Sequence, residues 1–242
     1  MNFTYLDYQR MIKMALNKGY TISDYTNIES CNKGIILRHD IDFNLERTLE
    51  IAMLEYSLGV SSTYFVLLST DFYNVFSKKS VGILNRILEM NHNIGLHFDE
   101  QRYNAGSLDE MKQHVYDEIL IFEKLIGKSV KVVSMHRPTQ LTLDSDVEFE
   151  GLINSYSSYF FKEMKYVSDS RMHFRENIFD IIESEFYDKI HILSHPFWYS
   201  DKVENTKDKL MGFLNEAKIN RYDSLENNFR DLNEYIKRDD VK

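Results

Sequence analysis

The 242-residue sequence contains one cysteine, Cys31, which excludes a disulfide within the chain. A chain without disulfides fits a reducing compartment. No apolar run approaches the length of a transmembrane helix. Asp7, Arg10 and Lys13 interrupt the N-terminal segment, so it lacks the apolar stretch of a signal peptide. These absences predict a cytoplasmic protein without a membrane span.

Positive charge is also scarce. The chain has 29 Lys and Arg residues against 38 Asp and Glu, a formal net charge of −9, and no cluster of basic residues offsets it. This balance argues against non-specific binding to nucleic acid or to anionic membranes. No proline- or glycine-rich linker, internal repeat or low-complexity segment divides the chain. The length and the apolar fraction of 43% predict a single domain over residues 1–242.

Four short apolar runs each end in a polar cluster. The clusters are Arg38-His39-Asp40-Ile41-Asp42, His97-Phe98-Asp99-Glu100, His136-Arg137-Pro138 and His195-Pro196. The runs are rich in β-formers and helical stretches separate them, which predicts parallel strands joined by crossovers. Active sites of α/β proteins lie beyond the carboxyl ends of such strands. We therefore expect the four clusters to form one catalytic site.

The segments between the runs predict helices. One is expected over residues 4–18, and a capping box of Ser107 and Glu110 opens another that runs to Gly127. Two short strands are expected at Tyr156–Phe161 and Lys165–Ser168. An apolar stripe predicts a last helix over about residues 222–238. The alternation predicts an α/β fold with a parallel sheet, closed or open, around a motif-bearing core over residues 35–200.

The first cluster places two carboxylates together. Side chains alternate along a strand, so Asp40 and Asp42 point the same way and His39 points to the opposite face. A divalent metal that binds one carboxylate and leaves the other as a base would relieve their repulsion. The alternative for Asp42 is that it caps a helix beginning near Asn44.

The other three clusters supply complementary chemistry. A ligand role is favoured for His97 because Gly95 permits close backbone approach. A set of histidine and carboxylate ligands suits zinc and tolerates cobalt, nickel, iron or manganese. Arg137 offers a planar fork that can hold a carboxylate, with a surface ion pair as the alternative. His195 can deliver a proton to a leaving nitrogen. Trp198 is either an apolar wall of the site or ordinary core.

These motifs, together with Tyr166-Val167-Ser168-Asp169-Ser170, resemble in order those of the polysaccharide deacetylases. More narrowly, they resemble the divergent NodB-homology proteins of bacterial surface-polysaccharide gene clusters. The resemblance implies a distorted (β/α) barrel, one divalent metal ion and hydrolysis of an N-acyl group from a sugar. By position it implies the following roles: Asp40 as base, Asp42 and His97 as metal ligands, Arg137 as partner of the base and His195 as acid. Asp169 and Trp198 are the candidates for contact with the substrate.

The sequence departs from that family at two positions. Ile41 separates two aspartates that are adjacent in the family motif, so the roles of Asp40 and Asp42 are open to exchange. Gln101 stands where the family has a second histidine, so one metal ligand is missing from its usual place. We predict that His136 replaces it. His39 is the alternative, which strand alternation disfavours.

The sequence thus predicts a metal-dependent hydrolase, with zinc as the first expectation for the metal. Its expected substrate is an N-acylated sugar intermediate of surface-glycan biosynthesis. One alternative is an amidohydrolase that cleaves another C–N bond on the same scaffold. The other is a catalytically inactive barrel that binds a sugar or a partner protein.

Overall fold

The computed structural model describes residues 1–241. The chain forms two compact units, of which the first is Phe3–Asp201 and the second begins at Lys202. All the strands and all the predicted site residues belong to the first unit.

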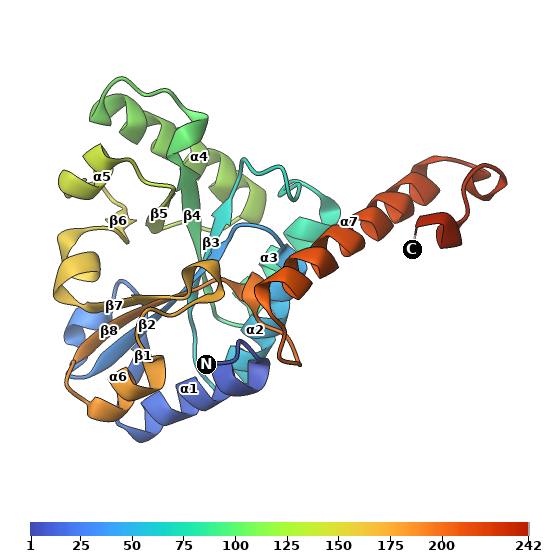
Figure 1. Cartoon of the computed structure of the whole chain (residues 1–242). Coiled ribbons are helices and arrows are strands. Elements are labelled where there is room, and N and C mark those ends of the chain that lie inside the picture. Colours follow the sequence, from blue (N-terminus) through green and yellow to red (C-terminus); the bar gives the residue numbers. More distant parts are fainter. Residues whose placement is uncertain (242) are drawn as a thin grey trace. The chain divides into compact units, whose positions relative to one another are not determined.

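Eight parallel strands form one sheet. Their bounds are β1 (Thr21–Ser23), β2 (Gly34–Ile41), β3 (Thr63–Leu67), β4 (Asn93–Asp99), β5 (Val132–His136), β6 (Ile153–Asn154), β7 (Lys165–Ser168) and β8 (Lys189–Ser194). The strand order is β6-β5-β4-β3-β2-β8-β7, and β1 pairs with the first residues of β2. Within the described residues no pairing joins β6 to β7, so the curled sheet is a distorted, incompletely closed α/β barrel, as predicted (Figure 1).

Helices connect the strands and flank the sheet (Figure 1). The α-helices are α1 (Tyr5–Asn17), α2 (Leu45–Ser57), α3 (Lys78–Glu89), α4 (Leu108–Ile126), α5 (Gln140–Asp144), α6 (Ile178–Ser184) and α7 (Thr206–Asn228). Short helical turns occupy Ile28–Ser30, Glu100–Arg102, Tyr159–Glu163, Ser170–Met172, Pro196–Trp198, Leu232–Glu234 and Arg238–Val241. Among residues 1–241, none of the helices has both the length and the apolar character to cross a bilayer.

Side-chain caps decide where two important helices begin. The predicted cap Ser107 accepts a hydrogen bond from the backbone N–H of Glu110 at 3.2 Å, which satisfies a donor that the first turn leaves unpaired. The C-cap of the same helix is Gly127, with φ +65°. Asn44 caps α2 by accepting from the N–H of Arg47. Capping therefore does not explain Asp42.

Strand β2 is buried on both faces, as expected for a central parallel strand. On one face Ile36 packs in an apolar cluster that includes Phe65. On the other face His39 meets Glu55 of α2. A Cβ atom at Gly95 would lie 2.5 Å from the Phe65 ring, so only glycine allows β4 to approach this closely.

Two local predictions differ from the structure. The segment Tyr156–Phe161 is not a strand, because residues 159–163 form a π-helical turn that places Phe160 in the apolar cluster. Tertiary packing outweighs the β-propensity of its aromatic residues here. The C-terminal helix spans residues 206–228 rather than about 222–238. Asn205 caps its start by accepting from Asp208, and a left-handed Asp231 with φ +63° follows its end.

The second unit is built around α7. Tyr222 donates a hydrogen bond to the carbonyl of Ile236 at 3.3 Å, and Arg238 pairs with Asp223 at 2.6 Å. Leu232 is buried in this unit. These contacts fold the short helical turns back onto α7.

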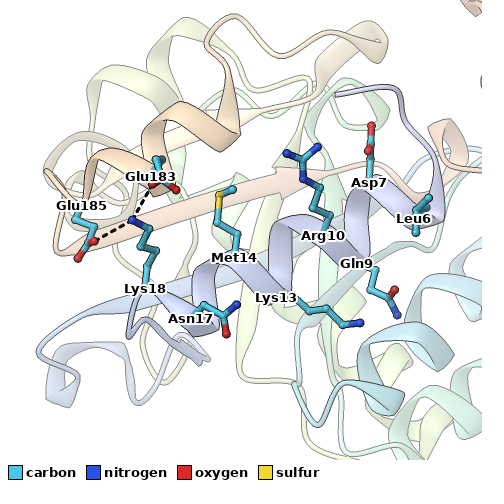
Figure 2. A pocket seen from close by; sticks show the side chains of 10 residues that line it. All are labelled: Leu6, Asp7, Gln9, Arg10, Lys13, Met14, Asn17, Lys18, Glu183 and Glu185. Atoms are coloured by element: carbon cyan, nitrogen blue, oxygen red, sulfur yellow. Dashed lines mark hydrogen bonds and ion pairs between the residues drawn. The ribbon is translucent and has the colours of Figure 1, made fainter.

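A surface groove of about 920 Å³ runs along α1 and the end of α6 (Figure 2). Figure 2 shows Lys18 reaching Glu183 and Glu185, with N–O distances of 2.9 and 3.3 Å. No predicted site residue lines this groove. The chemistry-bearing residues lie elsewhere in the first unit.

Candidate functional site

Three predicted ligands from three strand ends converge. Asp42 Oδ1 lies 3.3 Å from His97 Nε2 and 3.5 Å from His136 Nδ1, and the two imidazole nitrogens are 3.2 Å apart. The sheet register explains this, because β4 and β5 are neighbours in which His97 pairs with Ser134 and Asp99 with His136. Strand β3 lies between β2 and β4, so Asp42 reaches across one strand end.

The donor set fits a divalent metal. Ligand atoms about 2.0–2.1 Å from a tetrahedral zinc ion are separated from one another by roughly 3.3 Å. The three observed separations lie within 0.2 Å of that value. Asp42 Oδ1 is buried and accepts no hydrogen bond from the described residues. His97 contacts the Ser134 carbonyl through Nδ1 at 3.4 Å, a contact that leaves Nε2 to face Asp42.

Electrostatics favour the metal-binding forms of Asp42 and His136. Burial raises the pKa of Asp42, but His97, His195 and His136 outweigh it and hold the pKa well below its ordinary value. Burial, and then the neighbouring His97, lower the pKa of His136. An ionised carboxylate and a neutral imidazole are the states that bind metal ions.

Asp40 lies beside this set and is held by an arginine of its own strand. Arg38 donates to both carboxylate oxygens, from Nε to Oδ1 at 2.8 Å and from Nη2 to Oδ2 at 2.7 Å. Both side chains are buried, and Arg38 also bonds the Ser134 hydroxyl. Burial raises the pKa of Asp40, but Arg38 and then His97 outweigh it and hold the pKa below its ordinary value. Asp40 Oδ2 lies 3.5 Å from His97 Nε2, which places this ionised carboxylate at the candidate metal site.

The arginine expected beside Asp40 has a different partner. Arg137 bonds Asp99, and its side chain is 51% exposed. Its backbone has φ +51°, which turns the chain at the end of β5. The sequence signal for the correct arginine was present, because Arg38 lies two residues before Asp40 and therefore on the same strand face.

His195 is paired with Asp169. Its Nδ1 lies 2.5 Å from Asp169 Oδ1, and its backbone N–H donates to the same carboxylate. Burial lowers the pKa of His195, but Asp169 outweighs it and raises the pKa to about 9. Nε2 lies 3.7 Å from Asp42 Oδ2, on the side of the candidate metal site. Asp169 is fully buried, and its carboxylate orients His195. Contact of Asp169 with the substrate stays a prediction.

Trp198 is 7% exposed and packs against Phe197 and Phe43, with ring centroids 4.8 and 6.4 Å away. Phe43 directly follows Asp42, so the cluster flanks the candidate metal site. The indole Nε1 is buried, and no residue of 1–241 accepts a hydrogen bond from it. The structure thus gives Trp198 a core position whose polar atom has no protein partner.

His39, the alternative third ligand, lies on the opposite face of β2. Its Nε2 is 2.8 Å from Glu55 Oε1 and 3.2 Å from the Tyr8 hydroxyl. Gln101 lies in the helical turn after β4, where its backbone N–H donates to the Asp99 carboxylate. Neither residue belongs to the group of metal-ligating atoms that the structure assembles, which is Asp42, His97 and His136.

No protein-family model and no curated protein matches the chain. Solved structures do match. The peptidoglycan deacetylase PdaC from Bacillus subtilis is 19% identical, with a TM-score of 0.47, over 76% of this chain and 85% of that one. A family 4 carbohydrate esterase from Bacillus anthracis is 17% identical, with a TM-score of 0.46, over 84% and 82%. A CE4 family pseudoenzyme from Bacillus anthracis is 14% identical, with a TM-score of 0.43, over 76% of this chain and 63% of that one, less than two thirds of its length.

Proposed function

We propose that the protein is a metal-dependent hydrolase that removes an N-acyl group from a sugar. One observation carries the proposal: a three-ligand set has an arginine-paired aspartate, Asp40, 3.5 Å from His97 and an aspartate-paired histidine, His195, 3.7 Å from Asp42. A water-derived nucleophile, a base and an acid are what hydrolysis of an amide requires.

Asp42, His97 and His136 are the residues that would hold the metal. Three protein ligands with one open position are typical of catalytic zinc sites. When bound, a divalent ion supplies Lewis acidity toward the acyl carbonyl and toward water. Zinc is our first expectation, and cobalt, nickel, iron and manganese suit the same nitrogen and oxygen donors.

Asp40 is the proposed base. Its carboxylate stays ionised because Arg38 donates to both of its oxygens, and the bidentate contact fixes its orientation. An ionised carboxylate 3.5 Å from His97 Nε2 is within reach of a water at the ligand set. Asp40 would take the proton of that water as it attacks the acyl carbon.

His195 is the proposed acid. Asp169 binds its Nδ1, so the protonated Nε2 faces the site and can donate to the departing amine. The same pairing stabilises the imidazolium form, because a carboxylate lies against the ring. Asp40 lies in β2 and His195 follows β8, so the group that takes up a proton and the group that donates one are separate.

The motif resemblance supports a more specific setting. We propose an N-acylated sugar intermediate of surface-glycan biosynthesis as substrate and the cytoplasm as location. The paucity of cysteine and the scarcity of positive charge are compatible with both proposals.

Acetate release from N-acetylglucosamine and its oligomers by the zinc-loaded protein tests the function. We expect Asp40→Asn to lower turnover at least about 100-fold while about one zinc per chain remains, since a base contributes roughly 10²–10⁴-fold. Asp42→Asn is expected to lose both zinc and turnover. Asp117→Asn, an exposed aspartate of α4, serves as the matched control and should change neither.

Three results would contradict the proposal. Full activity of Asp40→Asn would remove Asp40 from the reaction. Stable zinc binding without acetate release from any N-acetyl sugar would favour the sugar-binding barrel instead. Release of another acid or amine from a non-sugar amide would favour the amidohydrolase.

A further inference from the structure

Arg38 makes Arg137 unnecessary for holding the base. Both oxygens of Asp40 accept from Arg38, and the two side chains are buried together. Arg137 lies at the end of β5, directly after the candidate ligand His136, yet it makes no contact with Asp40. An arginine beside the reacting centre therefore has no role in positioning the base.

The Arg137 guanidinium keeps most of its donors for other partners. It carries five N–H donors in a planar fork. Within residues 1–241 its one hydrogen-bonded partner is the Asp99 carboxylate, which Nη2 contacts. The side chain remains 51% exposed, whereas Asp99 is 9% exposed. Asp99 thus anchors one edge of the guanidinium and leaves the rest accessible.

The backbone at Arg137 is held in an unfavourable conformation. Its φ of +51° lies in the left-handed region, which is unfavourable for a non-glycine residue. Such residues persist where the surrounding structure determines them and gather at functional sites. Here the strained residue lies between a candidate metal ligand, His136, and Pro138. The left-handed backbone turns the chain at Arg137, directly after the end of β5.

We propose that Arg137 binds an anionic group of the substrate, a phosphate or a carboxylate, on the acylated sugar residue or on the linkage next to it. This inference rests on the proposed function. The guanidinium fork matches both anions in geometry and charge. Arg137 directly follows His136, and its partner Asp99 pairs with His136 across β4 and β5, so the guanidinium lies at the same edge of the sheet as the candidate metal site. The chain carries a net charge of −9, so an anionic substrate needs a specific cationic contact to offset the general repulsion.

Three sugars and two matched variants test this role. Binding of N-acetylglucosamine, its 1-phosphate and N-acetylglucosaminuronic acid is measured by calorimetry with the zinc-loaded protein. We expect the native protein to prefer one of the anionic sugars over the neutral sugar by about 10- to 100-fold, the effect of charge-assisted hydrogen bonds. The phosphate and carboxylate arms show which anion the site takes.

Arg137→Gln is expected to reduce that preference to about twofold, and Arg137→Lys to restore part of it. Arg102→Gln is the control, because Arg102 is also half-exposed and paired with one carboxylate, that of Glu118. It should keep the native preference. The neutral sugar should bind all variants about equally.

The outcomes separate this inference from the proposed function. Acetate release with equal affinity for neutral and anionic sugars, or an undiminished preference in Arg137→Gln, overturns the inference and leaves the hydrolase intact. An undiminished preference in Arg137→Gln would indicate that the metal, and not Arg137, binds the anion. An Arg137-dependent preference without any acetate release supports the anion site and overturns the hydrolase. Failure of all three sugars to bind at millimolar concentration overturns the inference as well.

Discussion

Glu55 of α2 is a buried carboxylate whose loss can be followed quantitatively. It accepts hydrogen bonds from Tyr8 Oη at 2.6 Å and Ser62 Oγ at 2.5 Å, and also from Tyr64 Oη. His39 Nε2 lies 2.8 Å from it, and the side chain is fully buried. The network joins α1, α2 and two strands of the sheet. Neutralising this carboxylate therefore removes the common acceptor of several elements.

The pKa of Glu55 gives the size of the effect. Burial raises it, but His39 outweighs burial, and the pKa falls from an ordinary 4.5 to about 2. A depressed carboxyl pKa stabilises the fold above the unfolded value, and the contribution is lost as the pH falls from about 4.5 toward 2. At 1.36 kcal/mol per unit, the shift corresponds to about 3 kcal/mol. Removing one partner of a buried ion pair costs a similar roughly 3–5 kcal/mol.

Urea unfolding of Glu55→Gln at several pH values tests this reasoning. We expect the variant to lose about 3 kcal/mol of unfolding free energy at pH 7, with the difference from the native protein narrowing below pH 4. The control is Glu46→Gln on the same helix, because Glu46 is 45% exposed in its pair with Lys79 and should cost less than about 1 kcal/mol. A loss below 1 kcal/mol at pH 7, or one that stays constant down to pH 3, would refute the assignment of Glu55 as an ionised anchor.

Further substitutions test the site. His136→Ala should weaken zinc binding at least about 100-fold, because one of three ligands is lost; competition with a chelator measures this affinity. His39→Ala should lower thermal stability and leave zinc affinity within about threefold. Arg38→Lys should retain zinc but lower kcat about 10- to 100-fold, because lysine lacks the bidentate fork; unchanged kcat would show that Arg38 does not orient the base. Asp169→Asn should lower kcat about 10²–10⁴-fold with zinc retained, as expected when His195 loses its orienting partner, and equal loss of zinc would instead place Asp169 in the metal site.

Several features of the candidate site followed from local pattern. Alternation along β2 predicted that Asp40 and Asp42 share a face and that His39 points away, and the contacts of all three agree. The preference for His136 over His39 came from the same reasoning. The structure brings His136 within 3.5 Å of Asp42, while the metal itself stays a prediction.

Other features depend on strand neighbours that no local pattern reveals. Asp169 holds His195 because β7 pairs with β8, and the sequence pattern does not show that these two strands are neighbours. Family resemblance predicted Arg137 as the partner of the base. In the structure Arg38, two residues away on the same strand, binds Asp40, and Arg137 binds Asp99. The position of Trp198, 7% exposed beside Phe43, likewise required the packed structure.

The sequence by itself determined the period of most elements, the polar residues at the strand ends and the face of β2 on which Asp40, Asp42 and His39 lie. These are short-range properties, set by backbone geometry and capping over a few residues. Tertiary structure decided which strand ends are neighbours, which arginine pairs with which aspartate, and where the last helix begins and ends. Those outcomes depend on strand order and on competition among several chemically equivalent partners, and only the folded chain brings the competitors within reach of one another.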